Sequence, residues 1–108
     1  MIKRITVFRA KPGLTREDVR AWWATHSDMA KGLPGLRGYT RNLVLKRLVG
    51  DAQLSGIIEL WWDDEKTMQR AFATPLSTAL REDAARCIEH QDSYLVEEMV
   101  TILLGRGR

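Results

Sequence analysis

Apolar and polar residues alternate along residues 2–9 (IKRITVFR), a period of two that predicts a β-strand. The Pro-Gly pair that follows marks a turn. From Thr15 onward the apolar residues recur at helical spacing, and Thr15 is expected to cap this helix with Asp18 three residues later. The predicted helix ends near Lys31, because the next residues, GLPGL, supply a glycine and a Pro-Gly pair that cannot continue it.

Two further strands are predicted in the middle of the chain, at residues 36–47 and 56–62. The second of them, GIIELWW, is almost wholly apolar, and the polar and small residues VGDAQLSG between the two suit a hairpin connection. We therefore expect these strands to be antiparallel neighbours in a sheet.

The last third of the chain predicts two helices and a strand. A helix begins at Asp63 or Asp64 and runs to about Ala73, and a Thr-Pro pair then starts a second helix over residues 75–90. The final strand is expected at residues 95–104, where both alternating sets of positions are largely apolar.

This order of elements predicts an α+β fold of the ferredoxin-like, split βαβ type, with a four-stranded antiparallel sheet and helices on one face. Both faces of the sheet contain large apolar residues. In the third strand Ile57 and Trp61 point one way and Ile58, Leu60 and Trp62 the other. Because helices cover one face only, a second copy of the chain is the simplest cover for the other face, which predicts a homodimer packed sheet against sheet.

Length and composition favour one domain spanning residues 1–108, with residues 105–108 (GRGR) as a loose tail. A hydrophobic fraction of 44% and a charged fraction of 29% are typical of a globular domain. No apolar run in the sequence approaches the length needed to cross a membrane, and residues 1–13 lack the apolar stretch of a signal peptide, so we expect neither a membrane span nor a signal peptide. With its single cysteine, Cys87, the chain is expected to be cytoplasmic and to have no membrane partner.

The basic balance of the chain, a formal net charge of +3, raises the question of nucleic-acid binding. Most basic residues have acidic neighbours, as in LTREDVR, DDEKTMQR and LREDAAR. Such interleaving is typical of solvated helix faces, so we expect no nucleic-acid partner.

His26 and Tyr39 are the residues in the first half of the chain that could carry chemistry. His26 lies within the apolar stripe of the first helix, so it is either a core histidine or a general acid/base in an apolar pocket. Tyr39 begins the second strand, where its hydroxyl either meets water or donates a hydrogen bond to a ligand oxygen.

Two carboxylates also fall among apolar positions. Asp83 lies on the apolar stripe of the helix after Pro75, where it could orient a histidine, pair with an arginine or meet solvent at the end of the stripe. Glu59 lies between Ile57 and Trp61 and must either reach a cavity or pair with a cation across the strands, since an unpaired buried carboxylate is costly.

Signals for metals and common cofactors are weak. The two histidines are 64 residues apart in sequence, Cys87 is expected in the core, and there is no G-x-G-x-x-G, P-loop, G-x-S-x-G or H-E-x-x-H motif. We expect no metal site and no cofactor.

Taken in order, the segments AWWATH, LPGLRGYTRN, IIELWWDD, AFATP, LREDAARC and VEEMVTI resemble the EthD family of dimeric α+β barrel proteins over about residues 2–103. The resemblance implies a ferredoxin-like fold and dimerisation through the sheets. By position, His26 and Tyr39 match the histidine and tyrosine implicated in relatives such as methylmuconolactone methylisomerase and polyketide cyclases of the barrel superfamily. Asp83, Trp22 and the segment from Glu59 to Trp61 also match, whereas Trp62 departs from the usual smaller aromatic residue.

The resemblance therefore implies a cofactor-independent enzyme of isomerase, cyclase or lyase type that acts on a small cyclic or aromatic oxygenated molecule. His26 would be the general acid or base, and Tyr39 would bind the oxygen on which charge develops. Asp83 and Glu59 are further substrate-binding candidates, and the candidate aromatic walls are Phe8, Trp22, Trp23, Trp61 and Trp62. Two alternatives stay open: a non-catalytic small-molecule binder, and a small monooxygenase with or without haem.

Overall fold

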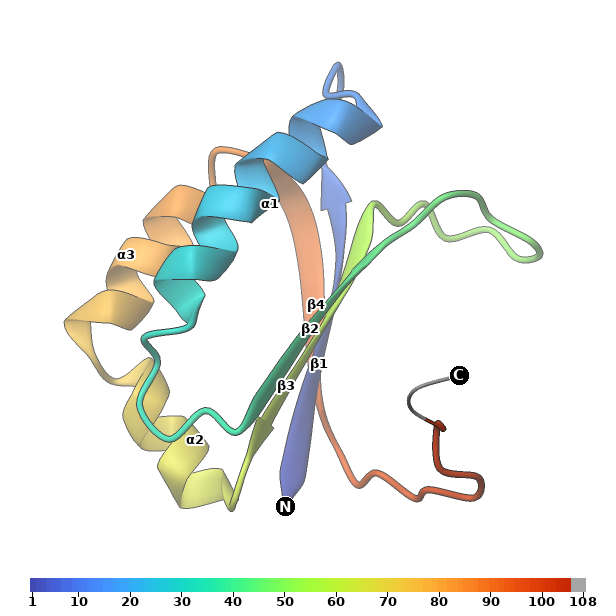
Figure 1. Cartoon of the computed structure of the whole chain (residues 1–108). Coiled ribbons are helices and arrows are strands. Elements are labelled where there is room, and N and C mark those ends of the chain that lie inside the picture. The colour runs from blue at the N-terminus through green and yellow to red at the C-terminus, as the bar shows by residue number, and fades with distance from the viewer. Residues whose placement is uncertain (106–108) are drawn as a thin grey trace.

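A computed structural model describes residues 1–105, so the end of the tail expected at 105–108 lies outside the described residues. One twisted antiparallel sheet has helices on one face only (Figure 1). The strand order is β2-β3-β1-β4, and the strands are β1 (Ile2–Ala10), β2 (Gly38–Leu43), β3 (Gly56–Trp62) and β4 (Ile88–Val96). The helices are α1 (Arg16–Ala30), α2 (Glu65–Phe72) and α3 (Pro75–Ala84). This arrangement confirms the predicted α+β, ferredoxin-like fold.

The first helix begins where the sequence predicted. The Thr15 hydroxyl accepts a hydrogen bond from the Asp18 backbone N–H at 3.1 Å, and the Asp18 carboxylate accepts one from the Thr15 N–H at 2.8 Å. This reciprocal cap satisfies two backbone donors that the first turn of a helix leaves unpaired. At the other end Lys31 is the C-cap, and the chain turns through Pro34 and Gly35 towards β2.

The last strand lies earlier in the chain than predicted. β4 occupies residues 88–96, not 95–104, and α3 ends at Ala84 instead of continuing to His90, which lies in β4. The partner strand explains the difference, because β4 pairs with β1 from Ile88 opposite Ala10 to Val96 opposite Lys3, one residue from the start of β1. Beyond Val96 this register leaves a single residue of β1, Ile2, so most of the apolar alternation that favoured 95–104 falls in a segment that is irregular as far as residue 105.

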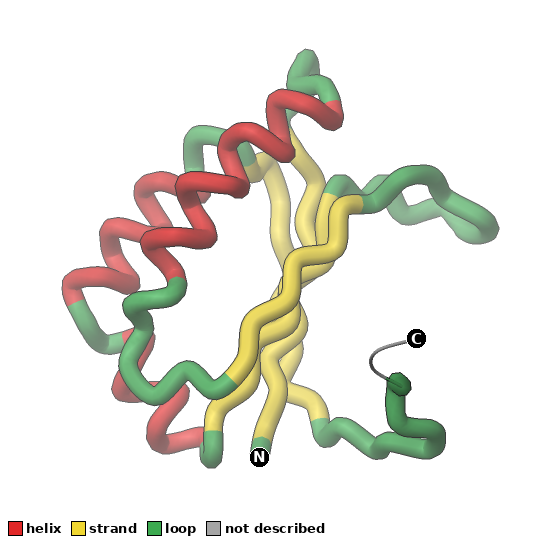
Figure 2. The backbone as a smooth tube through the Cα atoms, in the orientation of Figure 1, coloured by secondary structure: helices red, strands yellow, loops and turns green. Residues whose placement is uncertain are grey.

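The second strand was also predicted too long, since β2 covers residues 38–43 and not 36–47. Pairing with β3 ends at Leu43 opposite Gly56, and one further backbone bond joins the Val44 N–H to the Ser55 carbonyl. The chain then leaves the sheet. Figure 2 shows that this β2–β3 loop and the segment after β4 both extend on the side of the sheet opposite the helices.

The core lies between the sheet and the helices, in two clusters. The first surrounds Phe8, Val19, Trp23 and Cys87, and the second surrounds Trp62, which is completely buried and donates its indole N–H to the Pro34 carbonyl at 3.0 Å. In residues 1–105 no helix has the length and apolar character to cross a membrane.

A side chain added at Gly56 would report how tightly the cluster around Phe8 and Trp23 is packed. A Cβ at this position would lie 2.4 Å from Phe8 Cε2 and 2.8 Å from a ring carbon of Trp23. Because both rings are buried, we expect Gly56→Ala to lower the free energy of unfolding by about 1–3 kcal/mol in urea denaturation.

The matched control is Gly32→Ala. There a Cβ would meet the end of the Leu76 side chain at 3.1 Å, and the backbone φ is not positive. We expect it to cost less than Gly56→Ala, and equal losses in the two variants would contradict this account of the packing.

Candidate functional site

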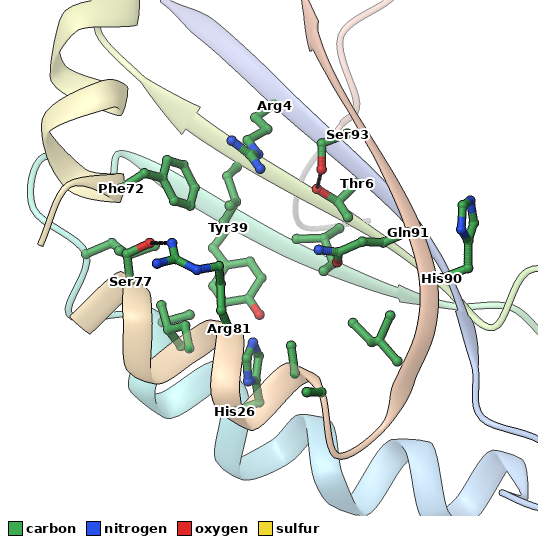
Figure 3. Close-up of a pocket in the computed structure, with 18 of the residues that line it drawn as sticks. Arg4, Thr6, His26, Tyr39, Phe72, Ser77, Arg81, His90, Gln91 and Ser93 are labelled. Atoms are coloured by element: carbon green, nitrogen blue, oxygen red, sulfur yellow. Dashed lines mark hydrogen bonds between the residues drawn. The ribbon is translucent and has the colours of Figure 1, made fainter. Parts of the chain in front are cut away.

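A cavity of about 630 Å³ lies between the helix face of the sheet and helices α1 and α3. His26 and Tyr39 both line it, and Figure 3 shows the Tyr39 hydroxyl pointing towards the His26 ring. Further polar residues that line it include Arg4, Thr6, Ser77, Arg81, Glu89 and Ser93. The cavity thus combines an apolar body with a few polar groups, as small-molecule sites do.

Helix α1 positions His26, and helix α3 holds it in place. His26 Nδ1 lies 2.8 Å from Asp83 Oδ2, and the histidine is 8% exposed. With Asp83 ionised, Nδ1 carries the proton and donates it to the carboxylate. The other ring nitrogen, Nε2, has no hydrogen-bond partner in the described part of the chain and is left with a lone pair on the cavity side.

Trp22 fixes the plane of the imidazole. Its indole ring stacks on the His26 ring with the centroids 4.6 Å apart and an interplanar angle of 28°. Its Nε1–H donates to the backbone carbonyl of Asp83 at 3.1 Å. Trp22 therefore holds both members of the His26–Asp83 pair, although it does not line the cavity itself.

Asp83 is kept ionised by its two partners. Burial acts to raise the pKa of its carboxyl, but the hydrogen bonds from His26 and from Arg86, the latter at 3.1 Å, outweigh burial and hold the pKa below its usual value. A carboxylate at this position fixes the tautomer of the histidine.

Tyr39 projects from the edge strand β2 onto the helix face of the sheet. Burial raises the pKa of its phenol above the usual value, and the neighbouring Trp23 indole and Arg41 offset this only in part. The Trp23 N–H lies near this hydroxyl, but within residues 1–105 it has no hydrogen-bond partner of normal geometry. At neutral pH Tyr39 is consequently a neutral phenol able to donate a hydrogen bond.

The remaining aromatic candidates do not line the cavity. Phe8, Trp23 and Trp62 are buried in the core with at most 2% of their surface exposed. Phe8 packs edge-on against Trp23, with centroids 5.2 Å apart. These side chains support the sheet and helices behind the site instead of forming its inner surface.

Glu59 and Trp61 lie on the opposite face of the sheet from His26. Glu59 meets Lys3 on the neighbouring strand at 2.5 Å, so it pairs with a cation across the strands and does not reach the cavity. This ion pair is the main reason that the pKa of Glu59 lies below its usual value, with burial opposing it. The Lys3 ammonium also lies over the Trp61 ring, 4.9 Å from its centroid.

Arginines 4 and 81 line the cavity, but the sequence pattern did not single them out. Arg4 occupies a helix-facing position of β1, and the alternation of apolar and polar residues in that strand gave no sign of a cation in a cavity. Arg81 lies in LREDAAR, where interleaved charge indicated a surface helix. Their place in the fold, not their neighbours in sequence, brings them to the cavity.

Within residues 1–105 no group of three or more His, Cys, Asp and Glu side chains is arranged to hold a metal ion.

Comparison with protein families identifies the chain. The EthD domain matches residues 11–91, so the chain belongs to the EthD family. A search of curated proteins finds no match. The match to the EthD domain confirms the resemblance drawn from the sequence motifs.

Solved structures share the fold at low sequence identity. An EthD family protein of Bacillus halodurans is 23% identical with a TM-score of 0.76, covering 92% of this chain and 99% of the other. A dimeric ferredoxin-like protein of unknown function from Thermobifida fusca is 17% identical (TM-score 0.70, 88% of each chain). Hydroxynitrile lyase from Passiflora edulis is 14% identical (TM-score 0.71, 92% of this chain and 95% of the other).

The Asp83–His26 pair predicts a specific loss of stability in acid. Because the folded pKa of Asp83 is depressed, its contribution is present above the unfolded pKa of about 3.9 and is lost as pH falls through the folded value. We expect Asp83→Asn to lower the free energy of unfolding by about 1–3 kcal/mol at pH 7, and to make that energy fall less between pH 7 and 3 than in the parent protein.

Asp28→Asn is the control, since its carboxylate pairs with Lys31 at 3.1 Å in an exposed position where such pairs contribute little. Denaturant unfolding at several pH values measures both variants. Parallel pH profiles for Asp83→Asn and the parent protein would refute the pairing.

Proposed function

We propose that this EthD family protein is a cofactor-independent enzyme that moves a proton on a small cyclic or aromatic oxygenated molecule, in an isomerase, cyclase or lyase reaction. One observation carries the proposal. His26 is bound through Nδ1 to Asp83, and within residues 1–105 its Nε2 is left without a partner on the side of a cavity that it shares with the Tyr39 hydroxyl.

His26 is the general base in this proposal. The neutral imidazole accepts a proton at Nε2 from a carbon next to a carbonyl or from a hydroxyl of the substrate, and the Asp83 carboxylate stabilises the imidazolium that forms. The same imidazolium then returns the proton to a different atom, which completes an isomerisation, a cyclisation or an elimination without net proton loss. Trp22 stacked on the ring limits its rotation during the two transfers.

Tyr39 is the hydrogen-bond donor to the substrate oxygen. The phenol stays protonated at neutral pH because burial raises its pKa, so it can stabilise negative charge that develops on an enolate or alkoxide oxygen. The relative described as a hydroxynitrile lyase is compatible with this chemistry, although at 14% identity it is evidence of fold alone.

A proton-transfer enzyme can be tested before its natural substrate is known. Small cyclic ketones, lactones and aromatic hydroxy-carbonyl compounds are incubated with the protein in D₂O, and deuterium incorporation next to the carbonyl is followed by NMR. We expect His26→Ala to reduce exchange by about 100-fold or more and Tyr39→Phe to reduce it by about 100-fold.

Thr25→Ala serves as the control, because Thr25 neighbours His26 in α1 but is exposed and bonds the Trp22 carbonyl. It should exchange at the parental rate, and circular dichroism checks that every variant folds. Full exchange by His26→Ala would refute the assignment, and ligand binding without exchange in the parent protein would favour a binding protein.

We also propose that the chain forms a homodimer through the open face of its sheet. That face carries Ile5, Val7 and Ile57, and beside it the β2–β3 loop and the segment after β4 expose Leu48 and Ile102, each more than four-fifths exposed. Large apolar exposure of this kind indicates a partner surface. The Thermobifida fusca neighbour, which is described as dimeric, supports the same assembly.

Light scattering at micromolar concentration should give twice the mass of one chain. We expect Ile57→Asp to shift the protein towards monomer, because it would bury an unpaired charge at the centre of the interface. Ala21→Asp, on the exposed side of α1, should leave the mass unchanged. A monomeric parent protein, or a dimeric Ile57→Asp, would contradict the proposal.

A further inference from the structure

Arg4 is a partly buried cation without a counter-ion in the described chain. It faces the helices from β1, and its guanidinium lies over the Phe72 ring, 4.2 Å from the centroid. Within residues 1–105 it makes neither a hydrogen bond nor an ion pair, so its N–H donors are left for the cavity. Burial lowers the pKa of Arg4 from its usual value, which reflects the cost of holding this charge out of water.

Arg81 brings a second guanidinium to the same cavity from α3. Its Nη1 donates to the Ser77 hydroxyl at 3.1 Å and its Nη2 to the Thr78 hydroxyl at 3.3 Å. Ser77 is 1% exposed, so one nitrogen of the guanidinium is anchored on a buried hydroxyl, while Arg81 as a whole is an exposed residue. Neither partner is a carboxylate, and the positive charge of Arg81 is therefore not neutralised by the contacts that hold it.

The carboxylate that lines the cavity is already paired with another residue. Glu89 lines the cavity, and it forms an ion pair with Arg9 at 3.3 Å. In Figure 3 the guanidinium groups of Arg4 and Arg81 point towards the Phe72 and Ser77 side of the cavity, and His26 lies at the other end beyond the Tyr39 ring. The cavity is consequently cationic at one end and carries its acid–base pair at the other.

We propose that this cavity binds a small organic carboxylate, with the carboxylate group held by Arg4 and Arg81 and the ring or chain extending towards His26 and Tyr39. The placing of the ring or chain near His26 and Tyr39 rests on the proposed function. The binding of an anion at the cationic end does not, because the two arginines would select an anion whether or not a reaction follows. Guanidinium groups match carboxylates in shape and charge, and such hydrogen bonds are stronger than neutral ones.

An organic acid fits this cavity better than an inorganic anion does. A volume of about 630 Å³ is far larger than a phosphate ion requires, and apolar side chains from both layers, among them Ile58, Leu60, Phe72 and Leu80, line it beside the arginines. A ligand with an apolar body and one anionic end uses both parts of the surface.

Isothermal titration calorimetry tests the proposal with phenylacetate, benzoate and cyclohexanecarboxylate, each compared with its uncharged carboxamide and with inorganic phosphate. We expect at least one carboxylate to bind at least tenfold more tightly than its amide and than phosphate. Arg4→Gln and Arg81→Gln should each weaken that binding about tenfold or more. Arg20→Gln, an exposed partner of Glu17, should bind as the parent protein does.

Two further measurements separate this site from other roles. Arg4→Met should lose carboxylate binding without lowering the melting temperature, whereas a purely structural Arg4 would cost stability when replaced. Carboxylate binding by the parent protein is measured separately from deuterium exchange, so a failure of the proton-transfer chemistry would leave the binding result intact. The proposal is overturned if no carboxylate binds more tightly than its amide, if phosphate binds as tightly as the acids, or if both glutamine variants bind like the parent.

Discussion

The hydrogen bond between His26 and Asp83 joins residues 57 positions apart in sequence, and the site depends on it. One partner belongs to α1 and the other to α3, so the bond sets how these helices lie over the sheet at the cavity. It also decides the tautomer of the histidine. Trp22, by stacking on the imidazole and bonding the Asp83 carbonyl, ties the same two helices together a second time. The packing of the two helices and the proposed chemistry thus depend on the same small group of side chains.

Much of the fold could be predicted from the sequence, and the part that could not has a physical cause. Helix α1 carries its own signals in the Thr15 cap and the Pro-Gly stop, so its bounds follow from local residues. Strand β4 has no such signals. It is an edge strand whose central residues, HQDSY, are polar and exposed, and its position is set by the length of β1. Pairing with a distant strand leaves no local pattern to read.

For the site, periodicity put His26 and Tyr39 on buried faces, and family resemblance singled them out, but neither could show that both line one cavity. The alternation of side chains along β3 also could not show which face of the strand the helices cover. For this reason Glu59 and Trp61 were candidates, although they lie on the face away from the helices. Arg4 was overlooked because a basic residue in an alternating strand is usually solvated. That it has no counter-ion among residues 1–105 is visible only once the three-dimensional neighbours are known.

The edge position of β4 has a consequence for how this protein family can diversify. Gln91 and Ser93 face the cavity from a strand that contributes almost nothing to either core cluster. Replacing Gln91 would reshape the rim of the cavity at little cost in folding free energy, whereas Ser93 also holds the buried Thr6 hydroxyl at 2.7 Å. Mutation can therefore explore new ligands along β4 while the helix pair and its buried aromatic residues stay constant. One scaffold could in this way come to serve many unrelated small molecules, each lineage keeping the same interior and differing at the rim.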